Sequence, residues 1–210
     1  MANNYVYTLD GKAYINLTNK CGNACSFCIR NTGDGVKDVA LWLEREPQSA
    51  DEVLTAFDKI APTLKSDEVV FCGFGEPTEA LEILKAVARR LKASGYKTRL
   101  NTNGLGNLVN GKNIAAELKG LIDVASVSLN NYNAQKYLEI TSSVYGLRAF
   151  PAVVEFAEQC KAQGIDTVFT VVDTIGAQDI ARCRELCKSL SIPLRVREYV
   201  ADNYKNEQGV

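Results

Sequence analysis

The feature that most constrains the fold is a regular alternation of short apolar stretches with longer amphipathic ones along most of the chain. The apolar stretches have the length and composition of strands, and the amphipathic ones repeat at the helical period. The predicted strands lie at about 12–17, 68–72, 97–101, 124–129, 167–172 and 194–200. The predicted helices lie at about 49–64, 78–94, 112–119, 133–139, 147–163 and 177–190. Such alternation favours a parallel sheet with right-handed crossovers.

Local signals mark two of the predicted boundaries. Asp10-Gly11 is a turn signal between strand-favouring residues, so residues 5–17 are predicted to form a hairpin whose second arm leads into the sheet. Ser49 and Glu52 have the spacing of a capping box, which predicts the start of the first helix.

Six strand–helix units are too few for the eight of a closed barrel. A partial barrel and an open doubly wound sheet both fit the pattern. We expect an α/β fold, a partial (β/α)6 TIM-like barrel of parallel strands in a single domain. It would cover residues 1–200, with residues 1–12 as an N-terminal hairpin arm and 201–210 as a polar tail.

Composition excludes several classes of function. The chain has no histidine, so Ser-His-Asp and Cys-His catalysis are ruled out. Its 24 Lys and Arg residues are balanced by 25 Asp and Glu residues, so the chain has no excess of positive charge that would attract nucleic acid or an anionic membrane. No apolar stretch approaches the length of a membrane span, and the N-terminus lacks a signal-peptide pattern. We therefore expect a cytoplasmic protein.

Three of the seven cysteines, Cys21, Cys25 and Cys28, lie within eight residues directly after a predicted strand. Soft thiolates at this spacing select zinc, copper(I) or an iron–sulfur cluster. Structural zinc usually has four Cys or His ligands, and no second cysteine pair lies nearby. Three thiolates on a cluster of four irons would leave one iron open for chemistry. An iron–sulfur cluster is favoured, with structural zinc and unliganded core cysteines as alternatives.

This C-x-x-x-C-x-x-C loop, with Phe27 in its aromatic position, resembles the signature of the radical S-adenosylmethionine (SAM) superfamily. The resemblance implies a 4Fe-4S cluster on the three cysteines and SAM on the open iron. It also implies an oxidoreductase in which SAM is cleaved to a 5′-deoxyadenosyl radical that abstracts hydrogen from a substrate. A one-electron donor such as flavodoxin or ferredoxin would be the partner.

A second stretch, Gly73-Phe-Gly-Glu-Pro77, follows the next strand and resembles the Gly-Gly-Glu-Pro motif of the same family. The resemblance implies that Gly73, Gly75 and Glu76 contact the amino group of SAM. A carboxylate suits an ammonium group, and glycine allows close backbone approach. The stretch departs from the motif at Phe74. An ordinary strand-to-helix turn is the alternative, because Pro77 also suits a helix start.

Polar residues follow the ends of later strands, where active sites form in parallel α/β folds. The resemblance implies SAM contacts for three of them, Asn103, Ser128 and Asn130. Arg197 in the last strand is predicted to contact a carboxylate or to form a salt bridge. Among the other cysteines, Cys160, Cys183 and Cys187 continue apolar helix stripes and are predicted to pack in the core. Cys72 fits either strand burial or the SAM site.

The resemblance covers about residues 13–200 and places the chain with small, single-cluster members of the family, such as the TatD-associated group. The substrate stays open among a small molecule, a peptide and a protein. A glycyl-radical-enzyme activating protein is one alternative. A non-catalytic iron–sulfur or zinc module is another, and metal content together with SAM cleavage would separate it from an enzyme.

Overall fold

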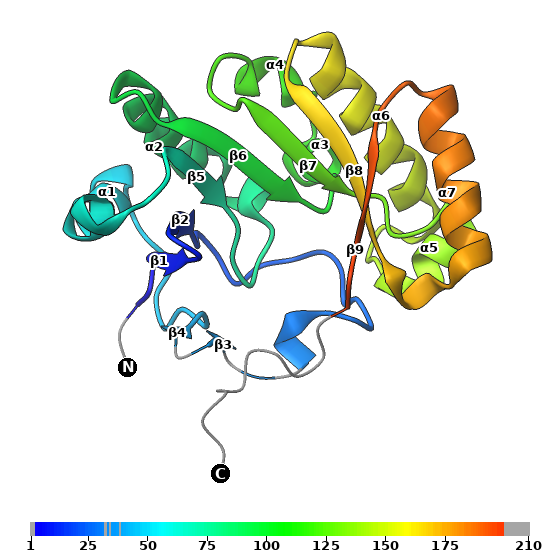
Figure 1. Cartoon of the computed structure of the whole chain (residues 1–210), viewed down its shortest axis with the longest axis horizontal. Helices are drawn as coiled ribbons and strands as arrows, with labels where there is room; N and C mark the ends of the chain where they lie inside the picture. The colour runs from blue at the N-terminus through cyan, green and yellow to red at the C-terminus, as the bar shows by residue number, and fades with distance from the viewer. Residues whose placement is uncertain (1–2, 32, 34, 38, 200–210) are drawn as a thin grey trace.

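The computed structural model describes residues 3–31, 33, 35–37 and 39–199. Seven strands form one sheet in the order β1-β2-β5-β6-β7-β8-β9 (Figure 1). Its strands are β1 (Val6–Leu9), β2 (Lys12–Ile15), β5 (Glu68–Phe71), β6 (Lys97–Thr102), β7 (Val124–Ser128), β8 (Asp166–Val172) and β9 (Leu194–Arg197). β1 pairs antiparallel with β2, and every later pair is parallel. The predicted α/β fold with six parallel strands and an antiparallel first arm is confirmed.

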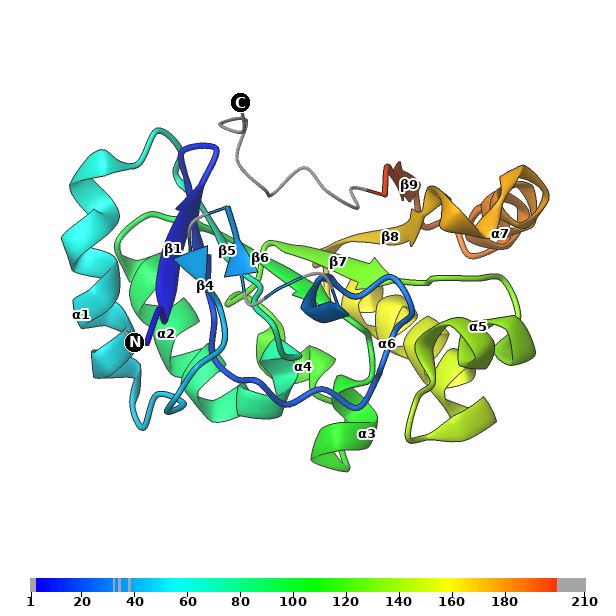
Figure 2. The ribbon, with the colours of Figure 1, turned by 90° about the horizontal axis from the view of Figure 1, so that it is seen from below.

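The longer helices connect successive parallel strands, and α2, α4 and α6 lie along one face of the sheet (Figure 2). The helices are α1 (Ala50–Ile60), α2 (Leu81–Ala93), α3 (Gly106–Asn110), α4 (Ala115–Leu118), α5 (Ala134–Thr141), α6 (Ala149–Ala162) and α7 (Ala177–Ser189). Within the described residues, no helix combines the length and the apolar character needed to cross a membrane.

The hydrophobic core lies between the sheet and these helices. Because side chains alternate between the two faces of a strand, every second residue points toward the helices. Val69, Phe71, Val127 and Phe169 lie on that side and are completely buried in one cluster. The intervening positions face the other side of the sheet, and they include the charged residues Glu68 of β5 and Arg99 of β6.

Both predicted local signals are confirmed. Asp10 and Gly11 have positive φ angles of 51° and 78°, as a tight hairpin turn between β1 and β2 requires. The side chain of Ser49 accepts a hydrogen bond from the backbone N–H of Glu52 at 3.3 Å and so caps α1. Glu52 itself pairs with Arg45 at 2.9 Å.

Several predicted boundaries were wrong in detail. The helix expected from residue 78 begins with a 3₁₀ turn, Pro77–Ala80, before α2. The helix expected at 112–119 is the shorter α4, and a further short helix that was not predicted, α3, precedes it and ends where Gly111 adopts a left-handed φ of 64°. The last strand ends at Arg197, and the polar tail lies outside the described residues.

One small hairpin was not predicted from the sequence, whereas the predicted burial of three cysteines is confirmed. The small hairpin of β3 (Gly35–Val36) and β4 (Val39–Ala40) was not predicted, since two-residue strands are too short to show a period. Cys160, Cys183 and Cys187 are at most 2% exposed, which confirms their predicted packing in the core.

The partly buried carboxylate of Glu68 should make the stability of the fold depend on acid pH. Burial alone would raise its pKa, but hydrogen bonds and charge from Lys12 and Arg99 outweigh burial and hold the pKa below the usual 4.5. A lowered pKa means that the unfolded chain takes up the proton first, so this stabilisation is present above pH 4.5 and is lost as the pH falls through the folded value.

The Glu68→Gln variant should therefore lose about 1–3 kcal/mol at pH 7 and show a shallower decrease of Tm between about pH 5 and 3. Calorimetric melting across that range measures both effects. Glu185→Gln serves as the control, because Glu185 is exposed and its ion pair with Arg182 contributes little. An identical pH profile in the Glu68 variant and the wild type would contradict the assignment.

Candidate active site

The loop that carries the three cysteines lies at the carboxyl edge of the parallel sheet, beside the loop that follows β5 (Figure 1). Two backbone hydrogen bonds join these loops. The N–H of Gly75 donates to the carbonyl of Thr18 at 2.9 Å, and the N–H of Glu76 donates to that of Lys20 at 2.7 Å. The position of the cysteine loop is thus determined by the neighbouring strand.

The cysteine loop is held from its other side by the end of α5. The N–H groups of Ala24 and Ser26 donate to the carbonyls of Thr141 and Ile140 at 2.8 and 2.9 Å. The side-chain amide of Asn23 donates to the hydroxyl of the fully buried Tyr137 at 3.2 Å. These anchors come from residues more than a hundred positions away.

The thiols of Cys21, Cys25 and Cys28 are half-buried and form no disulfide. Burial raises the pKa of Cys21, and it raises the pKa of Cys25 to about 12, with the neighbouring charges of Cys28 and Cys21 adding to the effect. The three sulfurs therefore lie within electrostatic reach of one another. Cys21 and Cys28 also line a cavity of about 450 Å³.

The spacing of these thiols matters for what they can hold. Within the part of the chain that the structure describes, no three His, Cys, Asp or Glu side chains are grouped as the ligands of one metal ion. Cys21, Cys25 and Cys28 are three free thiols on one loop, and soft donors of this kind fit an iron–sulfur cluster.

Glu76 is a buried carboxylate, 3% exposed, next to the cysteine loop. Its Oε1 accepts hydrogen bonds from the N–H and the hydroxyl of Thr78 at 3.1 and 2.7 Å and from the hydroxyl of Thr102 at 2.7 Å. Its Oε2 accepts one from the N–H of Asn103 at 2.6 Å. Burial raises the pKa of Glu76, and these hydrogen bonds oppose that shift.

Asn103 connects the two predicted motifs. Its backbone binds Glu76, and its side-chain amide donates to the Sγ of Cys21 at 3.7 Å. The structure thus brings Cys21, Glu76 and Asn103 together from three different loops. A single asparagine contacts both the cysteine loop and the buried carboxylate.

Gly73 and Gly75 are needed because the chain packs closely against itself. A Cβ on Gly73 would collide with the side chain of Asn16, and one on Gly75 would collide with the carbonyl oxygens of Thr18 and Lys20. Glycine is therefore required here by the neighbouring backbone, whether or not a ligand also approaches.

The other three predicted contacts form no side-chain hydrogen bond with this group among the described residues. Phe27 is half-buried within the cysteine loop, and Ser128 is half-buried at the end of β7. Asn130 is buried and has a positive φ of 60°, an arrangement typical of a constrained loop.

Sequence reasoning missed one wall of the cavity. The guanidinium of Arg30 lies 5.0 Å from the centroid of the Trp42 ring, and Trp42 meets Phe74 edge-on at 6.3 Å. All three residues line the cavity with Cys21 and Cys28. Phe74 occupies the position where the glycine motif departs from its family pattern. That departure was the one sequence signal that could have indicated this aromatic wall.

A parallel α/β partial barrel with a three-cysteine loop and a buried carboxylate at its carboxyl edge defines an enzyme class. Residues 15–187 match the sequence profile of the Radical SAM superfamily. The match extends over most of the chain, which belongs to the radical SAM superfamily of enzymes. The family implies an iron–sulfur cluster and SAM as cofactors. Among curated proteins, none matches the chain in sequence.

Solved structures share this fold. SuiB of Streptococcus suis, bound to its precursor peptide SuiA, aligns with a TM-score of 0.64 and 16% identity over 93% of this chain and 40% of SuiB. The protein anSMEcpe, with AdoMet and the Kp18Cys peptide, aligns with a TM-score of 0.63 and 18% identity over 92% and 54%. TYW1 with a lysine-pyruvate adduct aligns with a TM-score of 0.62 and 14% identity over 90% of this chain and 65% of TYW1. The chain spans less than two thirds of each.

Proposed function

We propose that this chain is a radical SAM enzyme domain in which Cys21, Cys25 and Cys28 hold a 4Fe-4S cluster. The observation that supports it best is the group of three free thiols, within electrostatic reach of each other, on a loop anchored at the carboxyl edge of a parallel sheet. Such a cluster would supply the one electron that breaks a C–S bond of SAM, which gives methionine and a 5′-deoxyadenosyl radical able to abstract hydrogen from a substrate.

The protein's own groups would support this site in two ways. The amide of Asn103 and the backbone N–H of Asn23 both donate to the sulfur of Cys21, and such donors stabilise a thiolate ligand. The hydrogen bonds from Ala24 and Ser26 to α5 hold the loop in place, so that the cysteines keep their relative positions.

We assign SAM binding to residues around that loop. Glu76 would receive the ammonium group of SAM, because Oε2 accepts a single internal hydrogen bond and keeps a second lone pair. The remaining proposed contacts are Phe27, Gly73, Gly75, Asn103, Ser128 and Asn130.

The Glu76→Gln variant should weaken SAM binding while the cluster is retained. An amide nitrogen would face the N–H or hydroxyl donors that now point at a carboxylate, and we expect a loss of about 1–3 kcal/mol in stability as well. Equilibrium binding of SAM to the iron-loaded protein and thermal melting measure the two effects. Glu158→Gln, on the exposed side of α6, is the matched control. Unchanged SAM affinity in the Glu76 variant would remove Glu76 from the binding site.

Anoxic reconstitution tests the proposal directly. The enzyme should bind about four irons per chain and, with a strong reductant, convert SAM to 5′-deoxyadenosine. A colourless protein that holds zinc would instead indicate a non-catalytic module. Iron binding without SAM cleavage under reducing conditions would contradict the enzymatic role.

We extend the proposal to the substrate, the electron donor and the bounds of the catalytic domain. SuiB and anSMEcpe were both solved with bound peptides, so a peptide joins a small molecule and a protein among the candidate substrates. A flavodoxin or ferredoxin in the cytoplasm would deliver the electron. Residues 1–200 would form the catalytic domain.

A further inference from the structure

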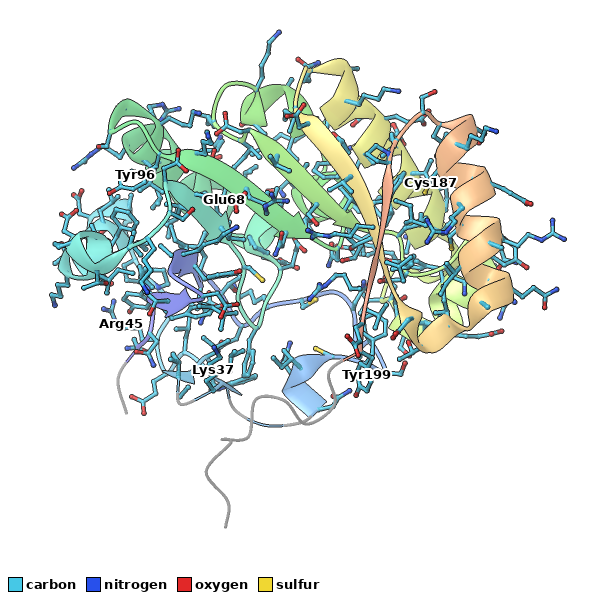
Figure 3. All side chains as sticks on the ribbon, viewed as in Figure 1. Lys37, Arg45, Glu68, Tyr96, Cys187 and Tyr199 are labelled. Atoms are coloured by element: carbon cyan, nitrogen blue, oxygen red, sulfur yellow. The ribbon has the colours of Figure 1, made fainter. Side chains whose placement is uncertain are left out.

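The face of the sheet opposite the helices carries a group of charged residues that the cluster site does not use. Leu194 and Val196 of β9 pack against the helix-side core, so Arg195 and Arg197 project from the other face. Arg195 donates to the hydroxyl of Ser126 on β7 at 3.4 Å, which places both on this inner face. Figure 3 labels Glu68, which lies over the middle of the sheet.

The carboxylate of Glu68 is already shared between two cations. Its Oε2 pairs with the Nζ of Lys12 at 2.5 Å, and its Oε1 accepts hydrogen bonds from the Nε and Nη2 of Arg99 at 2.9 and 2.7 Å. This trio therefore has one positive charge in excess before Arg195 and Arg197 are counted.

Arg195 and Arg197 add two more positive charges to the same face. In the described residues neither forms an ion pair with a carboxylate. Burial lowers the pKa of Arg195, and the charges of Arg99 and Arg197 lower it further, against a smaller opposing effect of Glu68. Three guanidinium groups thus lie within electrostatic reach, and among the residues that the structure describes only Arg99 of the three has an acidic partner.

The location of this group connects it with the candidate site. Arg197 pairs in register with Val172 at the carboxyl end of β8, the edge where ligands bind in parallel sheets. Its charge also acts on the thiol of Cys72, which follows β5 beside the Glu76 loop. Arg197 therefore lies at the carboxyl end of the sheet, within electrostatic reach of the residue that precedes the Glu76 loop.

We propose that Arg195 and Arg197, with Arg99 beside them, bind an anionic group of the substrate, a carboxylate or a phosphate. Guanidinium groups match the planar oxygens of both anions and bind them through paired hydrogen bonds. An anion between them also relieves the mutual repulsion of the like charges. The inference rests on the proposed function and names the chemical class of its substrate.

Anion binding by the anoxically purified full-length chain tests this inference. Isothermal titration at constant ionic strength would use inorganic phosphate and succinate as probes, with the neutral diamide of succinate as the comparison ligand. At least one anion should bind, and the double variant Arg195→Gln/Arg197→Gln should weaken its binding by about tenfold or more. Arg89→Gln removes the same charge from the exposed surface of α2 and should leave the affinity unchanged.

A charge-retaining variant and melting curves distinguish a loss of anion binding from a loss of folding. Arg197→Lys retains the charge and should lose less affinity than Arg197→Gln, while melting curves confirm that each variant is folded. Stronger binding of phosphate or of succinate identifies the anionic group. Binding of neither anion by the wild type, or equal binding by the double variant, would overturn the inference. The SAM cleavage assay is independent, so anion binding without cleavage would contradict the proposed function alone.

Discussion

Replacing Cys25 by alanine should abolish both the iron–sulfur absorbance and the cleavage of SAM. Cys25 is the middle one of the three free thiols, and burial followed by the neighbouring charges of Cys28 and Cys21 raises its pKa, so it lies near both. Two thiolates cannot replace three on a cluster that already leaves one iron open. After anoxic reconstitution we expect the visible absorbance to fall to background and 5′-deoxyadenosine to fall below detection.

A second cysteine provides the matched control for this experiment. Cys183 is completely buried on α7, outside the candidate site, and Cys183→Ala removes one thiol with a small loss of packing. The Cys183 variant should keep its iron and its SAM cleavage. Circular dichroism would show that both variants are folded. A Cys25 variant that still binds iron and cleaves SAM at the rate of the control would refute the assignment of the cluster.

Replacing Gly75 by alanine should destabilise the protein more than any other single methyl addition at the site. The added Cβ would lie 2.6 Å from the carbonyl oxygen of Lys20 and still closer to that of Thr18. Both contacts are with backbone, and the same segment carries the hydrogen bonds that join the two loops. We expect a loss of about 3 kcal/mol, which lowers Tm by about 6–12 °C.

The substitution should also weaken the two hydrogen bonds by which the Gly75 loop positions the cysteine loop. We therefore expect the Gly75→Ala protein to take up less iron during reconstitution than the wild type. Gly33→Ala is the control, because within the described part of the chain no atom beyond its sequence neighbours lies within 4 Å of the position of its Cβ. Thermal melting and iron analysis of the two variants settle the point, and a Gly75 variant as stable as the wild type would show that the loops can move apart without cost.

The fold could be predicted because its signals are local and repeated. The alternation of strand-like and helix-like stretches led to the parallel sheet, and Asp10-Gly11 and Ser49 marked the hairpin and the start of α1. The errors occurred where elements are short. The short helix α3 was not predicted, α4 is shorter than the helix predicted at 112–119, and β3 and β4 have two residues each, too few for a period to be seen.

The candidate site was predictable in part. The spacing of the three cysteines led to the radical SAM family, which the profile match confirms. The structure adds the contact of Asn103 with both Cys21 and Glu76 and the support of the cysteine loop by Tyr137. Nothing near Cys21 in the sequence indicates Tyr137, because the two are far apart in the chain. The roles assigned to Ser128 and Asn130 stay predictions.

By itself, the sequence determined the class of fold, the cysteine loop and the family, because strand period and cysteine spacing are carried by neighbouring residues. The tertiary structure alone decided which polar groups meet. Glu76 meets Thr102 and Asn103, and Arg195 faces Ser126, through the register of strands that pair only when the sheet forms. Register depends on packing across the whole sheet, so such contacts have no local signature in the chain.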